Sequence, residues 1–113
     1  MNNLKKNYAY EFNKLQIFFK KILIKQRNIF YNIFKNDIYF DQNTKVLDIG
    51  SANVNNDYDN IFIKNYPYKN NITCLSDQDL DLVKKNYPKL TTVVGDGKKM
   101  NFEANSFDIV FSN

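Results

Sequence analysis

Apolar side chains recur at helical spacing over the first third of the chain. From about residue 8 to residue 34, one face of a helix would carry Leu15, Phe18, Phe19, Ile22, Gln26, Ile29, Phe30, Ile33 and Phe34. Lysines fall mostly on the other side, and further apolar residues widen the surface beyond one stripe. The pattern predicts one long amphipathic helix, or two in succession, that packs on the sheet as an N-terminal extension. Contact of residues 8–34 with another chain, or with a membrane surface, stays open as an alternative.

Beyond residue 40, short apolar runs alternate with turn residues and with short helical patterns. Strands are predicted at residues 45–49, 72–75, 91–94 and 107–111. Helices are predicted at 57–66, begun by Asp57, and at 78–87, capped by Ser76 or Asp77. This succession is typical of right-handed βαβ units and a mainly parallel sheet of about four strands. We therefore expect an α/β fold, with a helical extension over 1–40 and the sheet domain over 41–113.

The first predicted strand ends in a pattern typical of a ligand site. Its apolar residues are interrupted by Asp48 and followed by Gly50, where the chain must turn sharply. In open α/β sheets, ligands bind just beyond the carboxyl ends of the strands, where the strand order reverses. The sequence thus predicts a binding site around residues 48–53.

Four segments, in their order and spacing, resemble the first half of a class I S-adenosylmethionine-dependent methyltransferase of the methyltransferase type 11 kind. They are Val46-Leu47-Asp48-Ile49-Gly50, Asp77-Gln78-Asp79-Leu80, Val94-Gly95-Asp96-Gly97 and residues 105–113. The resemblance implies a partial Rossmann-like sheet, since the complete family fold has about seven strands. It also implies S-adenosylmethionine as cofactor and methyl transfer to an acceptor, a small molecule or a macromolecule, that the sequence does not identify. A C-terminal half of the family fold would supply the remaining strands, and self-association of the chain is the alternative partner.

The resemblance assigns the amino-acid end and the ribose of the cofactor to the first two strand ends. Backbone groups of Gly50, Ser51 and Ala52 would meet both parts, because glycine lets the main chain approach a ligand closely. Asp48 would order this loop and the cofactor amino group, or would only cap the turn. Asp77 would accept hydrogen bonds from the ribose hydroxyls, with Ser76 as the alternative, unless it only caps the following helix.

The third and fourth strand ends complete the implied site. Asp96 matches the family position that accepts the adenine amine, and backbone beside it, at Gly97, would supply a second contact. Asn113 stands where the family places residues that face the transferred methyl group. No residue resembles a catalytic base, so the catalytic residues stay unassigned.

Two departures from the family pattern support a competing interpretation. Ala52 and Val54 stand where the family loop has glycines, and an alanine forced to positive φ would cost about 1 kcal/mol or more. The chain could therefore be a degenerate, non-catalytic fragment that serves as an interaction module. A nicotinamide-binding domain is disfavoured, because Gly-x-Gly-x-x-Gly is absent after Gly50.

Composition narrows the classes of partner. Residues 1–36 hold eight Lys and Arg against Glu11 alone, a balance of +7, whereas residues 37–113 hold eight Lys against eleven Asp and Glu, a balance of −3. The predicted sheet domain thus lacks the basic face that nucleic-acid binding requires. With one cysteine, Cys74, and no histidine, we expect no metal site and a reduced, cytoplasmic setting. The abundant asparagines are interpreted as compositional background.

Overall fold

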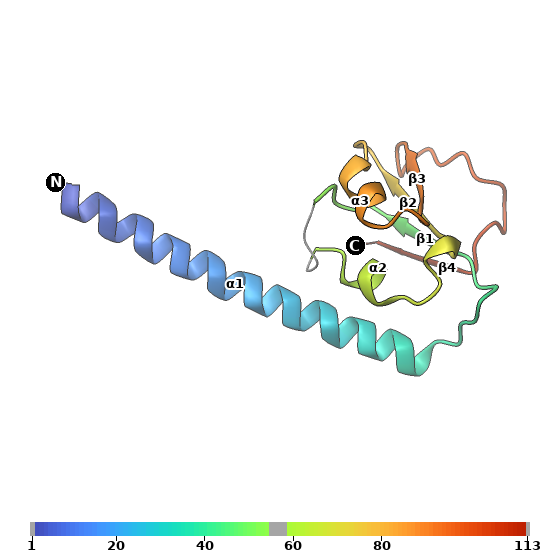
Figure 1. Cartoon of the computed structure of the whole chain (residues 1–113), viewed down its shortest axis with the longest axis horizontal. Helices are drawn as coiled ribbons and strands as arrows, with labels where there is room; N and C mark the ends of the chain where they lie inside the picture. Colours follow the sequence, from blue (N-terminus) through green and yellow to red (C-terminus); the bar gives the residue numbers. More distant parts are fainter. Residues whose placement is uncertain (1, 55–58, 113) are drawn as a thin grey trace.

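The computed structural model describes residues 2–54 and 59–112, with side chains from Asn13 onward. A long helix leads into a small α/β body (Figure 1). The elements are α1 (Asn2–Asp37), β1 (Val46–Ile49), α2 (Ile61–Asn65), the 3-10 helix η1 (Lys69–Asn71), β2 (Ile72–Ser76), α3 (Asp81–Asn86), β3 (Thr91–Val94) and β4 (Ile109–Ser112). The predicted α/β fold, with its N-terminal helix, is confirmed.

All pairings in the four-stranded sheet are parallel, in the order β3-β2-β1-β4. The central strand β1 places Asp48 between Cys74 of β2 and Phe111 of β4. Because the strands are parallel, their carboxyl ends lie along one edge of the sheet. The chain adds β2 and β3 on one side of β1 and then β4 on the other, so the strand order reverses beside β1. The sheet therefore has the reversal point at which α/β folds bind ligands.

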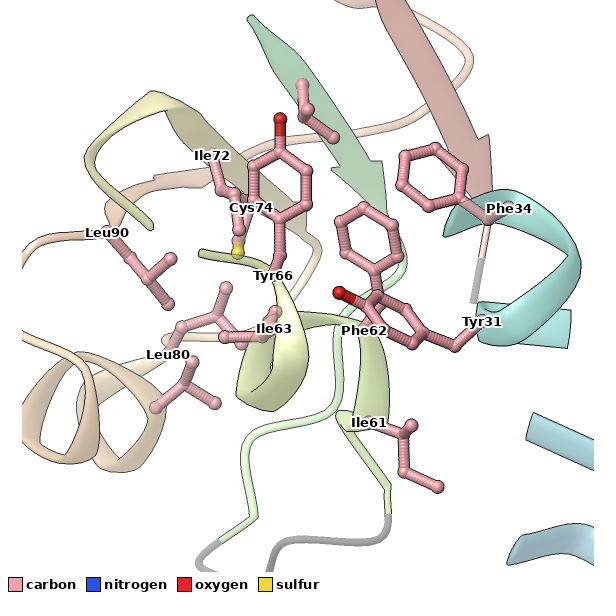
Figure 2. Packing of buried hydrophobic residues seen from close by; sticks show 12 residues of the cluster. Tyr31, Phe34, Ile61, Phe62, Ile63, Tyr66, Ile72, Cys74, Leu80 and Leu90 are labelled. Atoms are coloured by element: carbon pink, nitrogen blue, oxygen red, sulfur yellow. The ribbon is translucent and has the colours of Figure 1, made fainter. Parts of the chain in front are cut away.

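The two faces of the sheet are covered unequally. One face packs into the main core with the helices (Figure 2). That core comprises Tyr31, Phe34, Val46, Ile61, Phe62, Ile63, Tyr66, Ile72, Cys74, Leu80, Val83 and Leu90. On the opposite face Leu47 and Leu75 are buried, but Val110 is 55% exposed. The connection from β3 to β4 contains no helix in the described chain, which leaves this second face less protected.

An aromatic cluster attaches α1 to the body through α2. The Phe62 ring of α2 lies 4.9 Å from the ring of Phe34 and 5.8 Å from that of Tyr31, centroid to centroid. Figure 2 shows Phe62 beside these two α1 residues. The Tyr31 hydroxyl also donates to the Asn65 carbonyl at 2.9 Å. Apolar contact and one directional hydrogen bond together fix the last turns of α1.

The earlier turns of α1 stand clear of the body. At 1.5 Å per residue, the 36 residues of α1 extend about 54 Å, and Figure 1 shows the N-terminal half running away from the sheet. An ion pair between Arg27 and Asp59, 3.0 Å long, lies near the point where the helix leaves the body. The prediction that the helix packs on the sheet is thus corrected: it packs mainly on α2, and only through its C-terminal part. No helix in the described ranges is both long and apolar enough to cross a membrane.

Candidate functional site

A pocket of about 240 Å³ opens at the carboxyl ends of β1, β2 and β3. Its lining residues are Ile49, Gly50, Leu75, Ser76, Asp77, Gly95, Asp96 and Gly97. We call it the strand-end pocket. Four predicted cofactor-binding residues, Gly50, Asp77, Asp96 and Gly97, therefore surround one hollow although they follow three different strands.

Glycines shape this pocket in two ways. Gly50 turns the chain away from β1 with a φ of 83°, a conformation that most residues with a side chain rarely adopt. Its N–H donates to the Leu75 carbonyl at 2.8 Å and so prolongs the pairing with β2. A Cβ atom on Gly95 would come 3.2 Å from Leu75 Cδ1, and one on Gly97 would come 3.5 Å from Ile49 Cγ2. The bare backbone at these positions keeps the pocket open.

The loop after Gly50 has no strained backbone at Ala52 or Val54, the two positions where the family pattern has glycine. Among the described residues other than glycine, positive φ occurs only at Asn105, at 61°, and asparagine tolerates this region. The Ala52 carbonyl accepts hydrogen bonds from the Val54 N–H, at 3.0 Å, and from Asn60 Nδ2, at 3.1 Å. The expectation that Ala52 adopts a strained, glycine-like conformation is therefore wrong. In the described part of the loop, the chain turns at Gly50 and needs no further positive φ, and the buried Asn60 holds the Ala52 carbonyl.

Asn53 ties this loop to the start of α3. Its Oδ1 accepts hydrogen bonds from the backbone N–H groups of Leu82, at 2.9 Å, and Val83, at 3.4 Å, and its Nδ2 donates to Asp81 Oδ1 at 2.6 Å. Asn53 thus caps a helix that lies about thirty residues further along the chain. The sequence predicted Ser76 or Asp77 as this cap, and that prediction is wrong: α3 begins at Asp81, too far on for either to reach its first amides.

Replacing Asn53 with alanine should lower the free energy of unfolding by about 1 kcal/mol, within the roughly 0.5–2 kcal/mol range for lost caps. The variant leaves the first N–H groups of α3 without their acceptor. Asn43→Ala is the matched control, since the Asn43 side chain is exposed, and its effect should stay within about 0.5 kcal/mol. Urea unfolding followed by circular dichroism measures both. Equal effects of the two substitutions would contradict the capping role.

Asp77 is left available for a ligand by this arrangement. It is exposed and lines the strand-end pocket, and no described residue forms a hydrogen bond with its carboxylate. Ser76, its alternative, is buried, and its Oγ already accepts the Gln78 N–H at 3.2 Å. Because Asn53 supplies the cap of α3, the interpretation of Asp77 as only a helix cap is removed. The structure favours Asp77 over Ser76 as the group that faces the pocket.

Asp96 has one carboxylate oxygen engaged in its own turn. Asp96 Oδ1 accepts the Lys98 N–H at 2.9 Å, and the Asp96 carbonyl accepts the Lys99 N–H at 3.0 Å. The turn begins directly after β3, where the Gly95 N–H donates to the Ser76 carbonyl at 2.8 Å. The second carboxylate oxygen has no partner among the described residues, and Asp96 lines the strand-end pocket. This turn fixes where the carboxylate can meet a donor.

Asp48 and Ser51 form a buried polar pair outside the pocket lining. Asp48 is 0% exposed, and neither its carboxylate oxygens nor the Ser51 hydroxyl has a hydrogen-bond partner among the described residues. Burial raises the pKa of Asp48 to about 6, and the nearby Ser51 acts in the opposite direction. Burial, together with the Asp48 charge, raises the pKa of the neighbouring Cys74 thiol to about 12. Such an unsatisfied carboxylate beside the loop after Gly50 is a group that a cation or a hydrogen-bond donor would stabilise.

A second pocket, which the sequence did not predict, lies between α1 and the end of β4. Its volume is about 290 Å³, and its lining residues are Leu23, Gln26, Arg27, Phe30, Tyr31, Ile61, Phe62, Phe111 and Ser112. We call it the helix pocket. Its walls come from α1, α2 and β4, so only the packing of α1 on the body creates it. Asn113, predicted to face the methyl group from this strand end, lies outside the described residues.

Neither pocket offers a metal centre in the described chain, where no group of three or more acidic, cysteine or histidine side chains gathers. Gly50, Asp77, Asp96 and Gly97 are brought together, whereas Asp48, Ser51 and Ala52 lie behind them or in the loop beside them. Asn53 and Asn60, which hold that loop, gave no recognisable signal in a chain so rich in asparagine. No family model matches the chain, and no curated protein matches it either.

Proposed function

We propose that the chain binds S-adenosylmethionine and acts as the cofactor-binding part of a class I methyltransferase. The observation that carries the proposal is the meeting of Gly50, Asp77 and Asp96 around the strand-end pocket, at the reversal point of a parallel sheet. The side-chain-free walls at Gly95 and Gly97 and the unsatisfied Asp48 carboxylate also fit this cofactor. When bound, the cofactor supplies an electrophilic methyl group on a positively charged sulfur.

Each polar group of the site suits one part of the cofactor. The Asp77 carboxylate would accept hydrogen bonds from the ribose diol, and the free oxygen of Asp96 would accept one from the adenine amine. Asp48, with its loop, suits the amino group of the methionine end. The pocket volume of about 240 Å³ lies below the roughly 300–1,000 Å³ of ordinary ligand sites. We therefore assign the strand-end pocket to the adenosine part of the cofactor.

We assign the methyl acceptor to the helix pocket. The resemblance places acceptor groups near the carboxyl end of the fourth strand, and Phe111 and Ser112 of β4 line this pocket. Its other walls are mostly apolar and aromatic, which suits an acceptor with an apolar body. Methyl transfer requires chiefly that the acceptor be aligned with the sulfonium, so walls that orient the acceptor supply most of what the reaction needs.

Titration with S-adenosylhomocysteine tests the proposal. Binding to the folded chain alone should raise its melting temperature, and a free ligand concentration 100 times the Kd would stabilise it by about 2.7 kcal/mol. Asp77→Ala should weaken binding tenfold or more by calorimetry, because a charge-assisted acceptor of two hydroxyls is lost. Asp79→Ala, an exposed aspartate outside the pocket lining, is the matched control.

Further outcomes of these titrations test the role of each residue and the choice of cofactor. Asp96→Ala should weaken S-adenosylhomocysteine binding without creating a response to NAD. Unchanged affinity in Asp77→Ala would transfer the ribose role to Ser76. No thermal shift at millimolar ligand would refute cofactor binding by this chain.

A further inference from the structure

One stripe of α1 repeats with the spacing of a coiled coil. Its positions are Leu15, Phe19, Ile22, Gln26, Ile29 and Ile33, separated by four and three residues in strict alternation. This is the heptad pattern in which apolar a and d positions form a seam between two helices. With Phe19, Gln26 and Ile33 at a, the d positions are Leu15, Ile22 and Ile29. We call these six positions the α1 seam.

One member of the α1 seam, Gln26, also lines the helix pocket, but the body leaves the rest of the seam uncovered. Its five apolar side chains are 37–58% exposed: Leu15 52%, Phe19 58%, Ile22 37%, Ile29 49% and Ile33 54%. The residues that attach α1 to the body, Tyr31 and Phe34, occupy heptad positions f and b, on the opposite side of the helix. The body therefore covers one apolar face of α1, and the apolar side chains of the seam have no packing partner in the described chain.

We propose that the α1 seam pairs with the α1 seam of a second copy of this chain, as a parallel, in-register, two-stranded coiled coil. The pairing is self-complementary, as a symmetric homodimer requires. Because each body is attached to α1 through positions f and b, outside the seam, the two bodies project outward and leave the helices free to meet.

Gln26 fixes the direction and register of the pairing. It is an exposed polar residue in the middle of an otherwise apolar stripe. In a parallel, in-register pair, the two Gln26 side chains lie side by side at an a position and can hydrogen-bond to each other. In an antiparallel pair, a positions pack against d positions, and each Gln26 amide would face Ile22 or Ile29 without a polar partner. A buried polar residue of this kind is a known determinant of register.

The charges of α1 agree with this pairing. Lys14, Lys20, Lys21, Arg27 and Lys35 occupy the outer b and c positions of the heptad. Among the charged residues of segment 14–35, only Lys25 occupies an e or g position, beside the seam. In the parallel pair Lys25 lies opposite Phe30 of the second copy, which permits a cation–π contact and avoids like-charge repulsion.

The exposed apolar area is sufficient for a stable pair. Three further side chains flank the seam, Phe18 at 59%, Leu23 at 49% and Phe30 at 53% exposure, and two of them, Leu23 and Phe30, also line the helix pocket. An aromatic side chain has about 150–250 Å² to bury, so eight half-exposed apolar side chains together approach the roughly 800 Å² per partner of standard interfaces. A membrane surface is the other occupant such a stripe could have. The lysines lie mainly at c and g positions, on one side of the stripe, however, and Gln26 would interrupt the apolar surface.

Sedimentation equilibrium on the full chain tests the proposal. The parent should have twice the 13.4 kDa mass of one chain, and the double variant Ile22→Glu, Ile29→Glu should have the mass of one. Neither isoleucine packs against the body, so the variant should remain folded, and its circular dichroism spectrum should match that of the parent. Ile17→Glu is the matched control, since Ile17 is 56% exposed on the same helix but outside the seam, and it should stay dimeric.

Cross-linking tests the register. Gln26→Cys should form a covalent dimer on mild oxidation, because paired a positions bring the two thiols together, and Ile17→Cys should not. The chain's own cysteine, Cys74, is buried, so it should not form covalent dimers under the same conditions. A monomeric parent at tens of micromolar, a mass of four chains, or covalent dimers from Ile17→Cys alone would overturn the proposal. So would a monomer whose seam variants lose binding to phosphatidylserine vesicles, which would assign the stripe to a membrane.

Discussion

At pH 7, the Asp48→Asn variant is expected to be more stable than the parent chain. Its free energy of unfolding should be higher by up to about 3 kcal/mol. Asp48 is fully buried without a hydrogen-bond partner among the described residues, and burial raises its pKa from 3.8 to about 6. At neutral pH the parent therefore holds an unpaired charge inside the protein. An amide of the same shape removes that charge and leaves the packing unchanged.

The same pKa shift determines how stability depends on pH. The folded carboxyl, with a pKa of about 6, binds its proton more tightly than the unfolded one, with a pKa of 3.8. The contribution of Asp48 is thus most favourable below pH 3.8, decreases as the pH rises to about 6, and is constant above. Asp41, whose pKa is lowered first by the Asn43 N–H, acts in the opposite sense and loses its contribution as the pH falls below about 4.

Urea unfolding of parent and variant at pH 4 and pH 7 measures the effect of Asp48 alone, because every other group is common to both chains. The difference should be large at pH 7 and close to zero at pH 4. Equal differences at the two pH values would show that ionisation of Asp48 is not the cause. If Asp48 also meets the cofactor amino group, the variant should show a smaller thermal shift with S-adenosylhomocysteine than the parent.

Replacing Phe62 with alanine is expected to lower the free energy of unfolding by about 3–5 kcal/mol, the usual loss for a truncated core aromatic. Phe62 is 7% exposed, and its ring centroid lies within 4.3–5.8 Å of those of four other aromatic residues. Of these four, Tyr31 and Phe34 lie on α1, Tyr66 directly follows α2, and Phe111 lies on β4. The substitution should therefore loosen the attachment of α1 as well as the core, which urea unfolding and helical circular dichroism would report.

Two controls define that result. Tyr39→Ala removes an aromatic ring that is 84% exposed and should change stability by no more than about 0.5 kcal/mol. Phe62→Leu keeps an apolar side chain at the same place and should lose less than half as much as Phe62→Ala. A loss below about 1 kcal/mol in Phe62→Ala would mean that the aromatic cluster does not hold α1 to the body.

The sheet was predictable because its strands are short apolar runs between clear turn residues. The third strand lies at the predicted residues, 91–94, and the others differ by one or two residues at their ends. Gly50 could be assigned from sequence because a sharp turn after a buried strand requires positive φ. The convergence of Asp77 and Asp96 followed from strand direction alone, since parallel strands place their carboxyl ends at one edge.

What the sequence could not supply are contacts between distant polar side chains. Asn53 and Asn60 each determine the path of the loop after Gly50, through hydrogen bonds to α3 and to the Ala52 carbonyl. Nothing local distinguishes them from the many exposed asparagines around them. The sequence also could not predict how α1 attaches to the body, because its two apolar faces look alike in sequence. Only the aromatic cluster determines which face packs on α2.

The tie between Asn53 and α3 makes this short helix a reporter for the neighbouring loop. The backbone amides of Leu82 and Val83 donate to the Asn53 side chain, so their hydrogen–deuterium exchange rates should follow how often the loop opens. A molecule that settles against the Gly50 turn would slow exchange at these two amides without touching them. Occupancy of the site would thus be visible at a helix that lines no part of the strand-end pocket.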